Sequence, residues 1–143
     1  MIQLAKLSGF SPIITTASLS NTDALKKIGA THVLGRDLSA NDLISQVGKI
    51  TDSMKTSLEY VYDVVAAEAT QKLSVDLVQT LSHNKGGYIA VASPHILVSP
   101  PSDKIKIAKV FGAPAAYNDE LFKYLYQNLL YGWLEKGVIV VSH

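Results

Sequence analysis

The sequence predicts a three-layer α/β fold, in which a mostly parallel sheet carries helices on both faces. The first observation is that short apolar runs, rich in β-branched residues, alternate along the chain with segments of helical periodicity. The second is the stretch Ser11–Leu34, where a crossover helix between two strands makes those strands parallel. With 143 residues and 48% hydrophobic content, the chain can bury a core, and we expect a single domain over residues 1–143.

Turn and capping residues delimit the elements of the first half. Asn21 can cap a helix, and Gly29 can end that helix in a left-handed conformation. Ser39 precedes Asp42 by three positions, which resembles a capping box at the start of another helix. The predicted elements are a helix over 1–8 that Gly9 ends, a strand over Pro12–Thr16, a helix over Thr22–Ile28, a strand over Thr31–Leu34, a helix that Ser39 caps and that reaches Ile50, and a polar loop over 51–57.

The second half continues the alternation of strand and helix. Lysine and apolar residues alternate over Lys104–Phe111, a period of two that fits a half-exposed strand near the edge of the sheet. The longest helix starts at Asn118 or Asp119 and runs to Lys136, and Gly137 ends it. The other predicted elements are a strand over Leu58–Val65, a helix over Ala66–Leu81, a turn over 84–87, a strand over Tyr88–Ala92 and a closing strand over Val138–Val141.

The composition excludes several classes of function. The net charge is +1 and the 13 Lys and Arg residues are scattered, so we expect neither nucleic acid nor a membrane as partner. The chain has no cysteine, which excludes disulfides and cysteine-based zinc sites. The histidines lack the spacing of metal ligands, and we expect no metal site. No apolar run approaches the roughly 20 residues of a membrane span, and no signal peptide is recognisable, so we expect a cytoplasmic protein.

The segments IQLAKLSGF, IITTAS and LKKIGATHV carry a family resemblance. They resemble the middle of the nucleotide-binding domain of the medium-chain dehydrogenase/reductases, and most of all the zinc-independent quinone-reductase and fungal trans-enoyl-reductase branch. The resemblance covers nearly the whole chain, and Met1–Ala5 matches the helix that follows the family's Gly-rich phosphate loop. It implies an incomplete Rossmann-like domain, truncated relative to the family, because the first strand and that loop would stand before residue 1.

The resemblance implies NADPH as the cofactor. The family places the adenosine ribose at a loop that here holds Thr16 and Ser18, followed by Asn21. An acidic residue at this point would accept hydrogen bonds from the ribose hydroxyls and repel a 2′-phosphate, and the loop has none. Lys26 or Arg36 would have to reach the phosphate. An alternative interpretation is that Ser18 and Asn21 form a turn and cap a helix, and the two interpretations are compatible.

The resemblance also implies that two further loops contact the cofactor. Val65 and Ala66 are expected to meet the cofactor through their backbone, beside the adenine and the nicotinamide ribose. Asp63 just before them is more readily explained as a structural carboxylate than as a ligand. Ser93 would face the nicotinamide, or it forms only the turn out of a buried strand, and the sequence leaves both open.

No set of nucleophile, base and orienting residue is recognisable, so the catalytic residues stay unassigned. The chain therefore resembles the cofactor-binding domain of an NADPH-dependent quinone or enoyl oxidoreductase, with impaired or no turnover as an isolated chain. The family's substrate pocket lies against an N-terminal catalytic domain. An alternative is a non-catalytic oligomeric binding protein that recognises, for instance, a carbohydrate or a cell-surface partner. A third is a fragment of a longer enzyme.

The missing first strand affects the expected oligomer. In the family that strand is central, so its loss leaves Pro12–Thr16 and Leu58–Val65 without their shared neighbour. The two strands could pair directly, Val138–Val141 could fill the gap, or a second copy could supply a strand. We expect a homodimer or a domain-swapped oligomer, although the lysines of Lys104–Phe111 are of the kind that blocks edge pairing.

Overall fold

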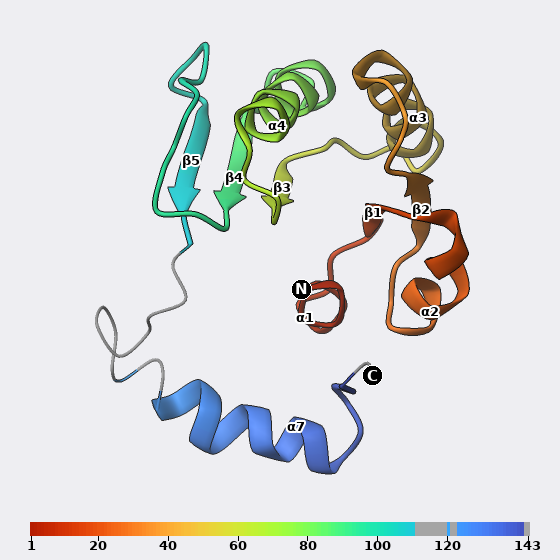
Figure 1. Cartoon of the computed structure of the whole chain (residues 1–143), viewed down its shortest axis with the longest axis vertical. Helices are drawn as coiled ribbons and strands as arrows, with labels where there is room; N and C mark the ends of the chain where they lie inside the picture. The colour runs from red at the N-terminus through yellow and green to blue at the C-terminus, as the bar shows by residue number, and fades with distance from the viewer. Residues whose placement is uncertain (111–119, 121–122, 142–143) are drawn as a thin grey trace. The chain divides into compact units, whose positions relative to one another are not determined.

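The computed structural model describes residues 1–110, 120 and 123–141 (Figure 1). They belong to two compact units, Met1–Asp37 with Gly112–His143, and Leu38–Phe111. In the described part of the chain every strand pair is parallel, and the sheets are flanked by helices, which confirms the predicted α/β class. The single domain over residues 1–143 stays a prediction.

The first unit contains a parallel pair of strands, β1 (Ile14–Ala17) and β2 (His32–Gly35). The register runs from Ile14 opposite His32 to Ala17 opposite Gly35. Both strands start later than predicted because the Thr31 side chain binds the backbone of Ile13, the residue just before β1. Its hydroxyl accepts a hydrogen bond from the Ile13 N–H and lies within hydrogen-bond distance of the Ile13 carbonyl, both at 2.9 Å.

The crossover between these strands differs from the prediction at its start. A 3₁₀ turn, η1 (Leu19–Asn21), precedes α2 (Thr22–Lys27), and the Asn21 side chain makes no capping hydrogen bond. Asn21 is thus the N-cap residue as predicted, but without a capping side chain, and the Thr22 hydroxyl donates to the Leu19 carbonyl at 2.6 Å within the turn. Gly29 follows the helix with a positive φ of 120°, in keeping with its predicted role as the terminating residue.

Three further helical segments belong to the first unit. They are α1 (Ile2–Leu7), the π-helix η2 (Tyr124–Leu130) and α7 (Tyr131–Glu135). Gly9 and Gly137 have φ values of 79° and 65°, as their predicted roles at helix ends require. The predicted start of the last helix at Asn118 or Asp119 lies outside the described residues, as does the end of the strand predicted to reach Phe111.

Val138–Val141 is not a strand, so the prediction of a strand at the end of the chain was wrong. Both backbone polar groups of Val140 are already occupied by the amide of Gln3. The Gln3 Nε2 donates to the Val140 carbonyl at 2.8 Å, and the Val140 N–H donates to the Gln3 Oε1 at 2.7 Å. A single side chain therefore supplies the partners that a neighbouring strand would otherwise supply.

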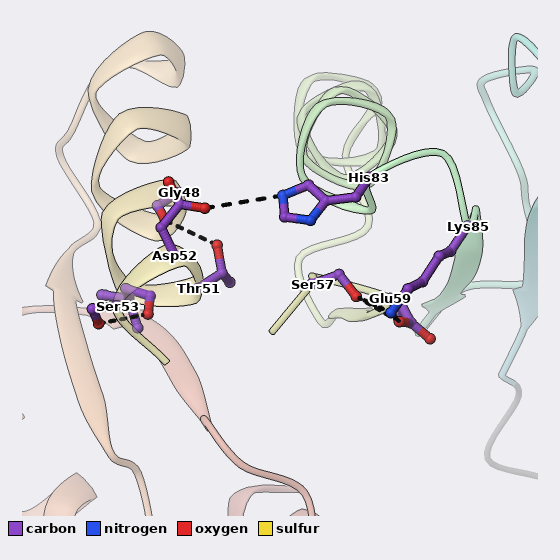
Figure 2. A network of polar contacts seen from close by, with 9 residues as sticks. Gly48, Thr51, Asp52, Ser53, Ser57, Glu59, His83 and Lys85 are labelled. Carbon is purple, nitrogen blue, oxygen red and sulfur yellow. Dashed lines mark hydrogen bonds and ion pairs between the residues drawn. The ribbon is translucent and has the colours of Figure 1, made fainter. Parts of the chain in front are cut away.

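The second unit begins with α3 (Ala40–Ser53). Ser39 caps it as predicted, since its hydroxyl accepts from the Asp42 N–H at 3.2 Å. The helix continues three residues into the predicted polar loop over 51–57, so that prediction was wrong at its start. Thr51 is buried and its hydroxyl donates to the Gly48 carbonyl at 2.9 Å (Figure 2), which makes this polar residue compatible with the helix interior.

A three-stranded parallel sheet forms the rest of this unit. Its order is β3 (Tyr60–Asp63), β4 (Gly87–Val91) and β5 (Ile105–Lys109), so β5 lies at an edge as predicted. Helix α4 (Glu68–Leu81) lies against this sheet (Figure 1). An apolar cluster forms the core between helix and sheet. Its buried members are Val75, Val78, Ile89, Val91 and Ile105.

Close backbone approach makes glycine necessary at the start of β4. A Cβ at Gly87 would collide with the Glu59 carbonyl and lie 3.0 Å from Cγ1 of Val78. Gly86, with a φ of 79°, is constrained in the same way by the Lys104 carbonyl. These two glycines therefore allow the three strands to enter the sheet side by side.

We predict that Gly87→Ala lowers the free energy of unfolding by about 2 kcal/mol, because the backbone of β3 has to move away from the added methyl group. The measurement is a urea titration followed by circular dichroism. Gly132→Ala in α7 is the matched control, since an added Cβ there meets no heavy atom within 4 Å. Equal stability losses in the two variants would contradict the steric explanation.

Candidate functional site

The candidate site in the second unit lies at the carboxyl ends of β3 and β4. Because the strands are parallel, the loop over 64–67 and the loop over 92–104 leave the sheet at the same edge. The pairing continues one step beyond the strands, where the Ala92 N–H donates to the Asp63 carbonyl at 2.9 Å. The edge where nucleotide ligands bind in open α/β sheets is therefore formed here by two adjacent loops.

Asp63 organises the first of these loops. Its side chain is 6% exposed, and it accepts hydrogen bonds from the Ala66 N–H at 2.9 Å and from the Thr70 hydroxyl at 2.8 Å. Ala66 has a φ of 57°, a left-handed conformation that is uncommon for a residue with a Cβ, and the carboxylate stabilises it. Asp63 therefore has the structural role that its sequence position favoured, and it is buried rather than solvated.

The structure brings Val65, Ala66 and Ser93 to this common edge of the sheet. Val65 is 74% exposed, whereas the Ala66 N–H donates to Asp63 and the Ala66 carbonyl accepts from Gln71, so both groups already have partners within the protein. Ser93 takes part in a turn, in which its hydroxyl accepts from the His95 N–H at 3.1 Å. Their contact with a cofactor stays a prediction.

The ribose-loop candidates Thr16, Ser18 and Asn21 lie in the first unit, at the carboxyl end of β1. Thr16 and Asn21 are exposed, while Ser18 is half-buried and its hydroxyl is 2.9 Å from that of Ser20. The Asn21 N–H donates to the Ser18 carbonyl at 2.9 Å, so these two residues form a turn. A turn leaves room for a ribose contact, which stays a prediction.

Sequence reasoning missed Gln71, a polar residue on α4 that is 1% exposed. Its Nε2 donates to the Ala66 carbonyl at 3.0 Å and to the His95 carbonyl at 3.3 Å, and its Oε1 accepts from the Leu97 N–H at 2.8 Å. A signal was available in the sequence. Gln71 lies four and seven positions before Val75 and Val78, and this spacing places all three on the buried face of the helix.

The surface of this edge is apolar. The exposed large side chains on the loops that follow β3 and β4 are Val64, Val65, Ile96 and Leu97. Together with backbone N–H and C=O groups, they can contact the flat rings and ribose of a nucleotide. Among the described residues, no group of three or more His, Cys, Asp or Glu side chains could hold a metal ion.

A second, polar hollow of about 340 Å³ lies at the opposite, amino end of the strands (Figure 2). Lys85 enters it from the turn before β4, and its Nζ lies 3.1 Å from both the Glu59 Oε1 and the Ser57 Oγ. His83 Nε2 is 3.9 Å from the Asp52 Oδ1. These charged side chains are largely paired with one another. The polar groups around the hollow therefore form a network that joins α3, β3 and the end of α4.

Hydrogen bonds from Ser57 and Lys85 lower the pKa of Glu59, while burial opposes this shift and the charge of Lys85 adds to it. A lowered folded-state pKa means that the contribution to stability is present above the unfolded pKa and is lost as pH falls through the folded value. We predict that Glu59→Gln costs about 0.5 kcal/mol at pH 7, and that this difference disappears in acid. Urea midpoints at pH 7 and pH 2.5 test this.

Asp103→Asn is the control for that comparison, because Asp103 is an exposed carboxylate in the same unit. Its substitution is expected to leave the urea midpoint unchanged at pH 7. A Glu59→Gln effect that persists undiminished at pH 2.5 would contradict an origin in the charged network.

No protein-family model and no curated protein sequence matches this chain. Among the solved structures that resemble it are two with a TM-score of 0.69 and 18% sequence identity over 99% of the chain. One is the mitochondrial 2-enoyl thioester reductase Etr1p/Etr2p heterodimer from Candida tropicalis, and the other is an Etr1p mutant in complex with NADP and crotonyl-CoA. The chain spans 41% and 40% of their lengths. The chain thus has the fold of part of these enoyl thioester reductase structures.

Proposed function

We propose that this chain is the cofactor-binding domain of an NADPH-dependent oxidoreductase of the quinone- and enoyl-reductase kind. The observation that carries the proposal is the carboxyl edge of β3 and β4, where the buried side chains of Asp63 and Gln71 fix two loops whose large apolar side chains are exposed. The fold shared with a reductase that was solved with NADP supports the same conclusion.

Each proposed contact has its own role in cofactor binding. In the second unit, Val65 and Ala66 meet the cofactor beside its nicotinamide ribose, and Ser93 lies near the nicotinamide. In the first unit, Thr16 and Ser18 meet the adenosine ribose, and Asn21 with Lys26 or Arg36 accounts for the preference for a 2′-phosphate. In this assignment most contacts use the backbone or small side chains.

The proposed chemistry of the complete enzyme is hydride transfer from NADPH to a conjugated enone or enoyl thioester. The nicotinamide supplies the hydride, and the protein supplies position and charge stabilisation. Because the chain spans about two fifths of the similar reductases, we expect impaired turnover or none from the chain alone.

We also propose that it associates as a homodimer in the cytoplasm. In the described part of the chain, no helix is long and apolar enough to cross a membrane.

One observation favours a second function, a non-catalytic binding protein. Tyr60 and Tyr88 are exposed neighbours on β3 and β4, and their rings stack with centroids 5.8 Å apart and planes inclined by 12°. Lys106 is the neighbour of Tyr88 on β5. A flat aromatic pair with an adjacent cation suits the ring face and hydroxyls of a carbohydrate, including one on a cell-surface partner. Binding to a glycan array without any NADPH binding would favour this alternative.

Calorimetric titration of the purified chain with NADPH and with NADH tests the first proposal. We predict saturable binding that is at least tenfold tighter for NADPH. Thr16→Asp is expected to reverse that preference, because a carboxylate at the end of β1 accepts hydrogen bonds from the ribose hydroxyls and repels the 2′-phosphate. Thr16 is exposed, so the substitution needs no repacking.

Ser8→Asp provides the matched control, since Ser8 is exposed in the same unit but outside the proposed ribose loop, and the change in charge is the same. It is expected to weaken NADPH binding at most slightly and to leave the preference intact. Absence of any binding at millimolar NADPH would overturn the proposed function. An unchanged preference in Thr16→Asp would overturn the assignment of the ribose loop alone.

A further inference from the structure

Gln71 connects α4 to two separate loops through one side-chain amide. The residue lies in the first turns of the helix, is 1% exposed, and makes three hydrogen bonds to backbone groups outside the helix. Burying an amide is unfavourable unless its donors and acceptor are satisfied, and here both kinds of group have partners. The buried amide of Gln71 therefore links the helix to both loops through satisfied hydrogen bonds.

The first loop is held from both sides of the Ala66 backbone. The Asp63 carboxylate accepts from the Ala66 N–H, and the Gln71 amide donates to the Ala66 carbonyl. The Thr70 hydroxyl donates to the second oxygen of Asp63, which fixes the carboxylate in turn. The left-handed conformation of Ala66 therefore depends on two buried side chains, one from β3 and one from α4.

The second loop is held at His95 and Leu97. Gln71 donates to the carbonyl of one residue and accepts from the N–H of the residue two positions later. A parallel strand uses the same pattern, a carbonyl and an N–H separated by one residue, to pair with its neighbour. The amide thus replaces a strand for a segment, 95–100, that has no regular secondary structure of its own.

We propose that Gln71 is a positioning residue that keeps the two cofactor loops in a fixed relation to each other. The inference rests on the proposed function, because the loops matter as a pair only if one ligand contacts both. Gln71 touches no cofactor in this proposal. It acts through Ala66 in one loop and through His95 and Leu97 in the other.

Gln71→Met tests the connection without any cofactor, because methionine keeps the length and volume of glutamine but loses its hydrogen bonds. The measurement is amide hydrogen exchange by NMR. We expect the Leu97 N–H to exchange at least tenfold faster, while the Ile89 N–H in β4 keeps its protection. Gln79→Met, on an exposed position of the same helix, is expected to change neither amide. Unchanged exchange at Leu97, or equal acceleration at Ile89, would overturn the positioning role.

Gln71→Glu distinguishes the effect of the hydrogen-bond donor from the effect of side-chain shape. A glutamate side chain keeps the shape of glutamine and the acceptor for Leu97, but when ionised it cannot donate and it repels the Ala66 and His95 carbonyls. We expect the Kd for NADPH to rise about tenfold in Gln71→Met and further in Gln71→Glu, with Gln79→Glu unchanged. A role in filling space alone predicts a Kd close to that of the wild type in both variants, because both side chains keep the volume of glutamine, and that result would overturn the inference.

The two measurements distinguish this inference from the proposed function. If the wild type binds no NADPH, the proposed function fails, while the exchange of Leu97 still decides whether Gln71 holds the loops. If the wild type binds NADPH and Gln71→Met binds it equally well despite faster exchange, the loops do not need to be positioned. That result would overturn the inference and leave the proposed function standing.

Discussion

The packing of α4 on the three-stranded parallel sheet is the constraint on which the rest of the second unit depends. Val78 is fully buried against Ile89 and Val91, which places the helix along the sheet. Parallel pairing then brings the ends of β3 and β4 together at one edge. The apolar contact fixes the position of the helix on the sheet. The polar side chains near each end of the helix then determine the conformation of the loops at that end.

The two ends of this unit satisfy their polar groups in different ways. At the carboxyl edge, Asp63 and Gln71 are buried and bind backbone groups of the loops, so losing either would leave loop carbonyls or N–H groups without their partners. At the amino edge, Glu59 and Lys85 are more exposed and pair with each other, where water can replace either partner. The buried network therefore has the greater effect on loop geometry.

Shared fold and low sequence identity are compatible in a chain of this kind. The proposed cofactor contacts use backbone groups and small or apolar side chains, for which many residue types are suitable. What has to persist is the position of the loops, and in this chain buried polar residues such as Asp63 and Gln71 provide it. The likeness to enoyl thioester reductases is therefore a likeness of framework, and the function has to be tested at the loops.

The sequence by itself determined the α/β class, the Ser39 cap, the helix-ending role of Gly137 and the edge position of β5, because each depends on periodicity or on residues within one or two turns. Only the tertiary structure decided which loops Gln71 binds and that Val138–Val141 forms no strand. Both depend on partners far along the chain, such as Gln3 with Val140, which are separated by 137 positions. Local patterns carry no signal for such pairs, so a polar side chain that replaces a strand is found only once the chain is folded.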